Sequence, residues 1–372
     1  MSTTSSSAWI VAEIRGRVGC LTLNRPKALN ALSLDMVRAI TDALLRWRDD
    51  AQVLAVVVRG MGKEGPFGAF CAGGDIRFFH QAALAGDPAL EDFFTEEYAL
   101  NHLIHTYSKP YIALMDGVVM GGGMGISQGA SLRLVTERTA MGMPETLIGL
   151  FPDVGGGYFL SRTAGHLGEY LALSGRVLKG LEPLVAGLAD AFVDSARLPR
   201  LWDSLGDTPF ESGEAVQRWC HTFATTPEWP RHPWPSAEID TVFALPTVAD
   251  IVSHLEATDS AWARDTAAVL RQRSPLMLHV VLEQIRRARG LGLADDLRLE
   301  RDLVRHCFVT RHLQRAGASS ETVEGIRALA VDKDHTPRWS PERVEDVTPA
   351  HWQPFFVSPW PAHAHPLRHL GE

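Results

Sequence analysis

Two glycine-rich turns constrain the fold of this chain more than any other feature of its sequence. They lie within Phe70–Ile76 and Gly117–Ser127, and each follows a short apolar run that is typical of a buried strand. A turn without Cβ atoms lets a ligand approach the backbone closely, and a turn that opens a helix presents amide N–H groups that favour negative charge. One such turn can hold a phosphate, and two that converge can stabilise an oxyanion. The pair therefore favours an α/β fold that binds an anionic group.

The spacing of the glycines argues against the two common phosphate-binding loops. The pattern G-x-G-x-x-G fails at Ile126 when it starts at Gly121, and at Gln128 when it starts at Gly123. No G-x-x-x-x-G-K-[ST] run occurs in the sequence either. Dinucleotide binding and P-loop chemistry are therefore disfavoured. For any single glycine, close packing of a helix on a strand is the simpler explanation.

The first 190 residues have the pattern of a compact α/β unit, and the remainder is mostly helical in pattern. Ser33 is a candidate N-cap for a helix in which apolar residues recur from Leu34 to Trp47. Apolar runs predict strands at Ile10–Ile14, Val18–Leu23, Leu54–Val58 and Tyr111–Met115, and a further helix at Glu91–Tyr107. We expect two regions, a core at 8–190 and a helical C-terminal region at 191–372 that completes the fold.

Charge and cysteine content exclude several classes of function. The 372 residues carry a net charge of −8, which disfavours nucleic acid or an anionic membrane as a partner. No apolar run reaches the roughly 20 residues of a membrane span. The Met1–Ser7 run has neither the basic nor the apolar segment of a targeting signal, so we expect a cytoplasmic protein. The cysteines form no C-x-x-C pair, which argues against a zinc ribbon or a disulfide framework: Cys20, Cys71, Cys220 and Cys307.

Two weaker motifs suggest other chemistry. Cys71 precedes a glycine turn, as a thiol nucleophile could, but no histidine lies near it in sequence and buried thiols are commoner. His102 and His105 can share a helix face with Glu96 or Glu97. A lone H-x-x-H on a helix is weak evidence for a metal site, and surface histidines explain it better. We expect no metal and no redox cofactor.

Two acidic residues follow prolines in otherwise apolar, glycine-containing stretches. Glu145 comes directly after Pro144, and Asp153 directly after Pro152. A carboxylate in apolar surroundings needs a partner or has a raised pKa, and a raised pKa suits proton transfer. Simpler explanations are that Glu145 lies in the first turn of a helix and that Asp153 is an N-cap. The spacing alone leaves both explanations open.

Longer runs resemble the crotonase (enoyl-CoA hydratase/isomerase) superfamily. Within residues 10–190 the matching runs are Leu21–Leu32, Phe70–Ile76 and Gly117–Gly125. Further runs are similar to the hydrolase branch of that superfamily, whose substrates are short 3-hydroxyacyl-CoA thioesters such as 3-hydroxyisobutyryl-CoA: Glu96–Tyr98, Met143–Leu160, and Gly325–Asp334 with Pro337–Trp339. The resemblance covers nearly the whole chain and is weakest at 195–300.

The resemblance implies a spiral of ββα units in which two backbone amides hold the thioester carbonyl. By position these amides belong to Gly74 and Gly122. The loop with Arg25 and Lys27 would lie near the nucleotide end of coenzyme A, although a solvated charged loop would have the same sequence. Coenzyme A is part of the substrate, so no separate cofactor is implied. The adenine side would be lined by Ala72, Asp75 and Ile76.

An exchange of acids separates this chain from the hydratases it resembles. Hydratases use two glutamates; one of those positions is Gly125 here, which cannot transfer a proton, and the other is Glu145. Asp153 stands where hydratases usually have glycine. The exchange implies that water is directed at the acyl carbon, with Glu145 as nucleophile or general base. Asp153 would orient the 3-hydroxyl or assist the leaving thiolate, and Glu97 resembles a substrate-binding acid or is a solvated helix residue.

We therefore expect a hydrolase of short 3-hydroxyacyl-CoA thioesters, of the kind used in valine catabolism. The alternatives are a hydratase or isomerase on the same fold, against which Gly125 argues, and a non-catalytic acyl-CoA-binding protein. The presence of both Glu145 and Asp153 argues against the second alternative. The acyl group stays open, because one methyl group contributes only about 1–3 kcal/mol in a pocket. Members of the superfamily often trimerise through their C-terminal helices, but the hydrolase branch differs there, so a homo-oligomer is possible and the oligomeric state stays open.

Overall fold

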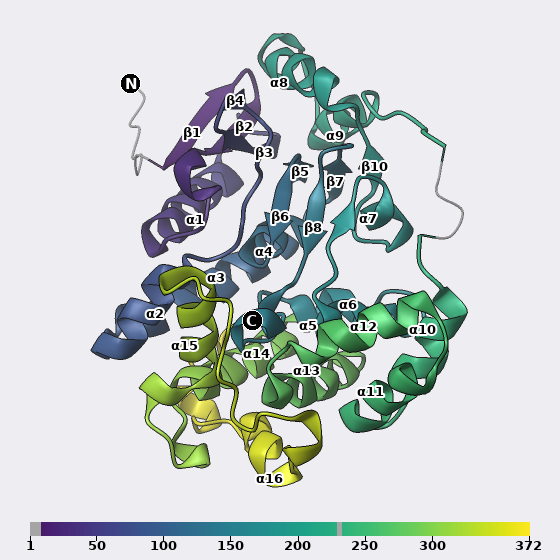
Figure 1. Cartoon of the computed structure of the whole chain (residues 1–372). Helices are drawn as coiled ribbons and strands as arrows, with labels where there is room; N and C mark the ends of the chain where they lie inside the picture. Colours follow the sequence, from purple (N-terminus) through teal and green to yellow (C-terminus); the bar gives the residue numbers. More distant parts are fainter. Residues whose placement is uncertain (1–8, 229–232) are drawn as a thin grey trace. The chain divides into compact units, whose positions relative to one another are not determined.

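A computed structural model describes residues 9–228 and 233–372, which form two compact units (Figure 1). The first unit contains residues 9–74, 99–142 and 178–228, and the second contains 75–98, 143–177 and 233–372. Each unit therefore takes chain from both sides of residue 190. The proposed division of roles at that residue, between a coenzyme A-binding core and a C-terminal region, stays a prediction.

The first unit is built on a mostly parallel sheet with the strand order β1-β2-β3-β5-β7-β10, and the short β4 pairs with β3. The pairs β1–β2 and β3–β4 are antiparallel, and the other neighbours are parallel. The strands are β1 (Ile10–Arg15), β2 (Val18–Leu23), β3 (Ala55–Gly62), β4 (Gly65–Pro66), β5 (Tyr111–Met115), β7 (Leu132–Val135) and β10 (Ala191–Phe192). The four strands expected from the sequence are confirmed, and β3 extends beyond the expected run.

Helices cover both faces of this sheet, which explains the continuous apolar run in β3. Cys20 of β2 belongs to a core with α8 (Leu198–Asp207) and α9 (Gly213–His221). Gly19 points to the opposite face, because side-chain direction alternates along a strand. A Cβ on Gly19 would lie 2.6 Å from the Trp47 ring of α1 (Leu34–Asp49). The expected cap of α1 is confirmed, since the Ser33 side chain accepts a hydrogen bond from the Met36 N–H.

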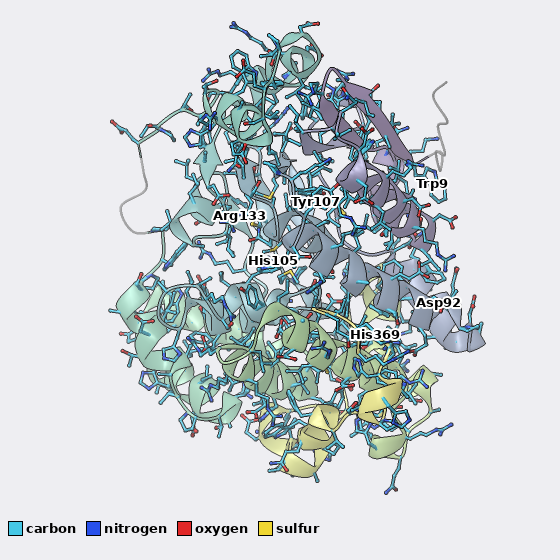
Figure 2. The ribbon with its side chains drawn as sticks, turned by 180° about the vertical axis from the view of Figure 1, so that it is seen from behind. Trp9, Asp92, His105, Tyr107, Arg133 and His369 are labelled. Carbon is cyan, nitrogen blue, oxygen red and sulfur yellow. The ribbon has the colours of Figure 1, made fainter. Side chains whose placement is uncertain are left out.

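A three-stranded sheet completes the first unit, in the order β6 (Val118–Met120), β8 (Ala140–Gly142) and β9 (Leu178–Lys179). Arg133 of β7, labelled in Figure 2, forms an ion pair with Asp190 at 2.7 Å and so ties β7 to the chain before β10. The remaining helices are η1 (Pro26–Ala28), α4 (Gly122–Gln128), α7 (Glu182–Val185), η3 (Ser195–Arg197) and the C-terminal part of α3 (Ala89–His105).

The second unit is built from helices, as the C-terminal sequence pattern predicts. Helix α13 is buried along most of its length and packs on α5 and α6. Aromatic rings join α2 to α3, with 4.9 Å between the Phe79 and Phe93 centroids. The main helices are α2 (Ile76–Ala85), η2 (Glu145–Ile148), α5 (Gly156–Leu160), α6 (Leu167–Ser174), α10 (Ser236–Phe243), α11 (Val248–Ala257), α12 (Ala261–Arg271), α13 (Pro275–Ala288), α14 (Leu293–Phe308), α15 (Glu321–Ile326), η6 (Arg327–Val331) and α16 (Pro349–Trp352). Across the described residues, none of the helices has both the length and the apolar character needed to cross a membrane.

Candidate active site

The two glycine turns lie side by side within the first unit. A parallel bridge joins Cys71 to Val119, and the Met120 N–H donates to the Cys71 carbonyl at 2.9 Å. Gly73 has a φ of +103°, and a Cβ there would lie 3.3 Å from the Met120 oxygen and 3.6 Å from the Gly122 nitrogen. This positive φ and the close approach explain the requirement for glycine at position 73. The first turn therefore reaches the start of the second.

Gly122 is the first residue of α4, and Gly121 is its N-cap. The N–H groups of Met124 and Gly125 donate back to the Gly121 carbonyl at 2.8 and 3.2 Å. The N–H of a residue at the first helical position has no carbonyl partner inside its own helix. On the other turn, Gly74 forms a parallel bridge with Leu32. Backbone pairing thus fixes both turns, and the roles of the Gly74 and Gly122 amides stay predictions.

The loop that carries Arg25 and Lys27 is attached to the first glycine turn. The Ala72 N–H donates to the Leu29 carbonyl at 3.0 Å, so the loop and the turn are neighbours. The Arg25 guanidinium lies 4.9 Å from the centroid of the Trp9 ring and donates a hydrogen bond within its own loop. Lys27, in η1, is exposed. An exposed cation on this loop fits both a phosphate contact and the solvated loop that the sequence left open.

Asp75 and Ile76, the other two residues expected near the adenine, begin α2 in the second unit. Asp75 is the N-cap of that helix, since its carboxylate accepts a hydrogen bond from the Phe78 N–H at 3.3 Å. A cap of this kind stabilises a helix by about 1 kcal/mol. Asp75 therefore has a structural role as a helix cap, and the proposed contact with the ligand would be a second role.

The second unit buries the three carboxyl groups that the sequence singled out. The exposed fraction is 2% for Glu97, 7% for Glu145 and 6% for Asp153. The hydroxyl of Tyr98 donates to Asp153 Oδ2 at 2.9 Å. Within residues 9–228 and 233–372, Glu97 Oε1 and Glu145 Oε2 have no hydrogen-bond partner. The alternative that Glu97 is a solvated helix acid is wrong, and unsatisfied buried oxygens of this kind call for a substrate group or water.

Burial changes the acidity of all three groups. It raises the pKa of Glu97 well above its usual range, and the nearby charge of Asp153 raises it further. Burial also raises the pKa of Glu145 well above its usual range, and the nearby charge of Asp153 raises it further. For Asp153, burial raises the pKa to about 7, although the hydrogen bond from Tyr98 lowers it. A carboxyl group such as that of Asp153, which exchanges a proton near neutral pH, is suited to general acid–base chemistry.

Local backbone geometry separates the two acids that follow prolines. Glu145 is the first residue of η2, so the expectation of a first-turn residue is confirmed and does not compete with a role in the site. Asp153 is not a helix cap, because the N-cap of α5 is Gly155, with a φ of +87°. Val154 also has a positive φ, of 55°. In this turn the Asp153 side chain is free to accept the hydrogen bond from Tyr98. The sequence did not predict Tyr98 as a partner, and only its position next to Glu97 could have suggested it.

The rival motifs occupy ordinary structural positions. Cys71 is buried, and its thiol donates to the Asn30 carbonyl at 3.2 Å. Asn30 also donates to the Ala69 and Phe70 carbonyls, each at 3.0 Å, which explains why a polar residue is buried there. In the described part of the chain, His, Cys, Asp and Glu side chains form no group of three or more that could hold a metal ion.

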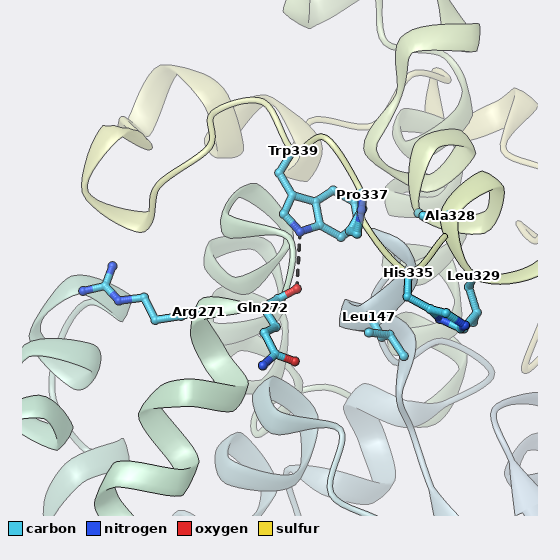
Figure 3. Close-up of a pocket in the computed structure, with 9 residues that line it drawn as sticks. Leu147, Arg271, Gln272, Ala328, Leu329, His335, Pro337 and Trp339 are labelled. Atoms are coloured by element: carbon cyan, nitrogen blue, oxygen red, sulfur yellow. Dashed lines mark hydrogen bonds between the residues drawn. The ribbon is translucent and has the colours of Figure 1, made fainter. Parts of the chain in front are cut away.

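The tail run that resembles the hydrolase branch folds around a pocket of about 260 Å³ in the second unit (Figure 3). Arg327 forms ion pairs with Glu324, Asp332 and Asp334 at 2.8, 2.6 and 2.7 Å, and so holds the loop that follows η6. The pocket is lined by Leu147, Arg271, Gln272, Gly325, Ala328, Leu329, His335, Pro337 and Trp339. It therefore borders η2, the short helix that begins with Glu145.

Comparison with known proteins shows similarity over most of the chain. The family model described as enoyl-CoA hydratase/isomerase matches residues 18–356. The mitochondrial 3-hydroxyisobutyryl-CoA hydrolase of Xenopus tropicalis is 40% identical over 348 residues, which are 92% of this chain and 87% of that protein. The protein of the same name from Rattus norvegicus is 39% identical over 363 residues, which are 96% of this chain and 91% of that protein.

Two solved structures share the fold over nearly their whole length. A carnitinyl-CoA dehydratase from Mycobacterium thermoresistibile has a TM-score of 0.85 and 36% identity, over 98% of this chain and 100% of that chain. An enoyl-CoA hydratase from Rhodobacter sphaeroides 2.4.1 has a TM-score of 0.82 and 37% identity, over 94% and 98% of the two chains. These likenesses confirm the expected crotonase-like α/β fold with its helical C-terminal region. The chain therefore belongs to the enoyl-CoA hydratase/isomerase family.

Proposed function

We propose that this chain is an enzyme that hydrolyses the thioester of a short 3-hydroxyacyl-CoA, such as 3-hydroxyisobutyryl-CoA, to the free acid and coenzyme A. The buried cluster of Glu97, Glu145 and Asp153 carries the proposal, because burial raises the pKa of all three carboxyl groups and brings that of Asp153 to about 7. The names of the relatives from Xenopus tropicalis and Rattus norvegicus support the same reaction. Water is the second substrate, and no cofactor or metal takes part.

In the proposed reaction the Gly74 and Gly122 amides hold the thioester oxygen. Each amide that hydrogen-bonds the tetrahedral oxyanion would stabilise it by about 3–4 kcal/mol, as in other acyl-transfer sites. Glu145 either attacks the acyl carbon, to give a mixed anhydride that water then cleaves, or removes a proton from the attacking water. The carbon–sulfur bond breaks in either route, and the thiolate takes up a proton. Asp153, with a pKa raised to about 7, is suited to deliver that proton or to bind the 3-hydroxyl.

The remaining predicted residues would bind the substrate. Glu97 Oε1, which is buried and has no partner among the described residues, can accept a hydrogen bond from the acyl hydroxyl. Arg25 and Lys27 would meet the phosphates of coenzyme A, and the adenine would lie against Ala72, Asp75 and Ile76. These contacts predict weaker binding, and little change in the chemical step, when either cation is removed.

A second candidate function is hydration or dehydration of an acyl-CoA on the same fold. The names of the two near full-length structural neighbours favour it. Against it stands Gly125, which lies buried in α4 and has no side chain to move a proton. A non-catalytic acyl-CoA-binding protein would have no need to keep Glu145 and Asp153, buried with raised pKa values.

One experiment separates these functions. Thiol release from (S)-3-hydroxyisobutyryl-CoA would be followed with a chromogenic disulfide, alongside hydration of crotonyl-CoA. Glu145→Gln and Asp153→Asn should each lower thiol release by about 10²–10⁴-fold. Glu169→Gln is the matched control, because Glu169 is also fully buried in the second unit but is paired with Arg289. Hydration without thiol release would contradict the proposal, and binding of coenzyme A without either reaction would indicate a binding protein.

Location, pathway and assembly stay predictions. The relatives reported above are named as mitochondrial, whereas the sequence predicts a cytoplasmic protein, and residues 1–8 lie outside the described part of the structure. A role in valine catabolism follows from the proposed substrate. Cell fractionation and the mass of the purified protein in solution would test the predicted location and homo-oligomer.

A further inference from the structure

Glu300 holds the turn that follows Asp153. It lies on α14 in the second unit and is fully buried. Its Oε2 accepts a hydrogen bond from the Gly155 N–H at 2.7 Å, and its Oε1 accepts one from the Gly157 N–H at 3.0 Å. Two amides bound to the two oxygens of one carboxylate fix both the position and the direction of a turn.

Asp296, one helical turn earlier on α14, supports the same segment. Its Oδ2 accepts a hydrogen bond from the Tyr158 N–H at 2.8 Å. A Cβ on Gly157 would lie 2.5 Å from Asp296 Oδ1, so the turn lies directly on the carboxyl groups of α14. A side chain at position 157 would therefore force Asp296 to shift.

The network also fixes the chain on the other side of Asp153. Gln284 of α13 donates through Nε2 to the Pro152 carbonyl at 2.7 Å and to Glu300 Oε1 at 3.2 Å. The carbonyl before Asp153 and the amide two residues after it are therefore fixed by one buried cluster. The side chain of Asp153 then meets Tyr98, and nothing in the proposed chemistry uses Glu300 or Gln284 directly.

Packing alone does not require two acids at these positions. Burial raises the pKa of Asp296 to about 6, and it raises the pKa of Glu300 well above its usual range, with Asp296 adding to the effect. The amides of Gly155 and Gly157 lower the pKa of Glu300 in part. Apolar residues of similar volume would fill the space, but they would leave the Gly155, Gly157 and Tyr158 amides without acceptors. The acids therefore indicate a need for precise geometry at this turn.

We propose that Glu300 is the positioning residue of Asp153, which it aims at Tyr98 and the substrate by accepting the hydrogen bonds of the Gly155 and Gly157 amides. This inference rests on the proposed thioesterase function, in which Asp153 acts on the bound thioester. Asp296 and Gln284 hold Glu300 and the turn in register.

The test is Glu300→Gln, which keeps the volume but has a single acceptor oxygen, so it cannot accept from both amides. We expect kcat for thiol release to fall by about 10–100-fold, as for a small misplacement of a reacting group, with KM changing far less. In an Asp153→Asn background the same substitution should cause no further fall, because its effect passes through Asp153. The matched control Glu169→Gln should keep kcat near wild type and combine additively with Asp153→Asn.

Two measurements do not depend on turnover. Hydrogen exchange at the Gly155 and Gly157 amides should become faster in Glu300→Gln, and a crystal structure should show Asp153 displaced from Tyr98. An equal loss of activity in both backgrounds, or an Asp153 that keeps its 2.9 Å contact, would overturn the inference. If Glu300→Gln does not fold, Gln284→Leu tests the same network from the Pro152 side. If the wild-type protein cleaves no thioester, the proposed function fails. Hydrogen exchange and the crystal structure of the variant then still decide whether Glu300 fixes the position of Asp153.

Discussion

Replacing Tyr98 by phenylalanine should move the pH dependence of thiol release to higher pH. The Tyr98 hydroxyl donates to Asp153 Oδ2 at 2.9 Å and lowers the pKa of Asp153, which burial raises to about 7. A hydrogen bond to a charged group contributes about 1.5–3 kcal/mol, which corresponds to roughly 1–2 pKa units. Because delivery of a proton requires the protonated form of Asp153, the alkaline limb of kcat/KM should lie near pH 7 in the wild-type protein. That limb should move upward by about 1–2 pH units in Tyr98→Phe.

The assay is thiol release at subsaturating thioester, measured across the neutral pH range in buffers of constant ionic strength. Tyr107→Phe is the control, because the Tyr107 hydroxyl, labelled in Figure 2, donates to the Leu44 carbonyl at 2.6 Å in the first unit. An alkaline limb that stays in place in Tyr98→Phe, or moves equally in Tyr107→Phe, would refute the reasoning. A downward movement would mean that protonated Asp153 is the donor to Tyr98.

Three further substitutions test other parts of the structure. Asp153→Asn should raise the free energy of unfolding by about 1–2 kcal/mol at pH 8. Because the pKa of Asp153 is higher in the folded protein, the native protein loses stability as the pH rises from the unfolded pKa, near 4, through about 7. The gain in the free energy of unfolding should therefore vanish near pH 4, as measured by urea titration. A gain that persists at pH 4 would contradict the raised pKa of Asp153. Cys71→Ala should keep thiol release near the wild-type rate, since a buried thiol that donates to Asn30 is no nucleophile, and a complete loss of activity in a folded variant would restore the thiol mechanism. Ser33→Ala should lower the free energy of unfolding by about 1 kcal/mol through loss of the α1 cap, and an unchanged value would show that the cap contributes nothing.

Local patterns were sufficient to predict much of the first unit. Strand β5 follows the bounds that its apolar run predicts, and Ser33 caps α1 because a short polar side chain precedes helical periodicity. The short strands β6, β8 and β9 were not predicted, since elements of two or three residues have no period to detect. The interleaving of the two units was not predicted either, because a shift of composition near residue 190 records local structure and not long-range packing.

For the site as well, local features could be predicted from the sequence and long-range contacts could not. The apolar neighbours of Glu145 and Asp153 indicated that these acids either have partners or have raised pKa values, and the spacing left their roles open; both acids are buried with raised pKa values. The partners that fix Asp153 could not be predicted. Tyr98 is 55 residues away along the chain, and Glu300 reaches Gly155 across 145 residues. Within a helix such as α14, an acid that faces the interior looks in sequence like one that faces solvent, and only the fold separates the two.

The interleaved units set an order of events during synthesis. The last described stretch of the first unit ends at residue 228, so its sheet can close while the C-terminal chain is still being made. Residues 75–98 and 143–177 must wait for α13 and α14, and at about 5–20 residues per second the remaining chain takes on the order of 10 s to appear. Phe79 and Phe93 belong to this second unit, so we expect their rings to stay exposed to solvent during that interval. Glu145 and Asp153 belong to the same unit as α13 and α14, so we expect them to be buried, with raised pKa values, only after these helices have left the ribosome.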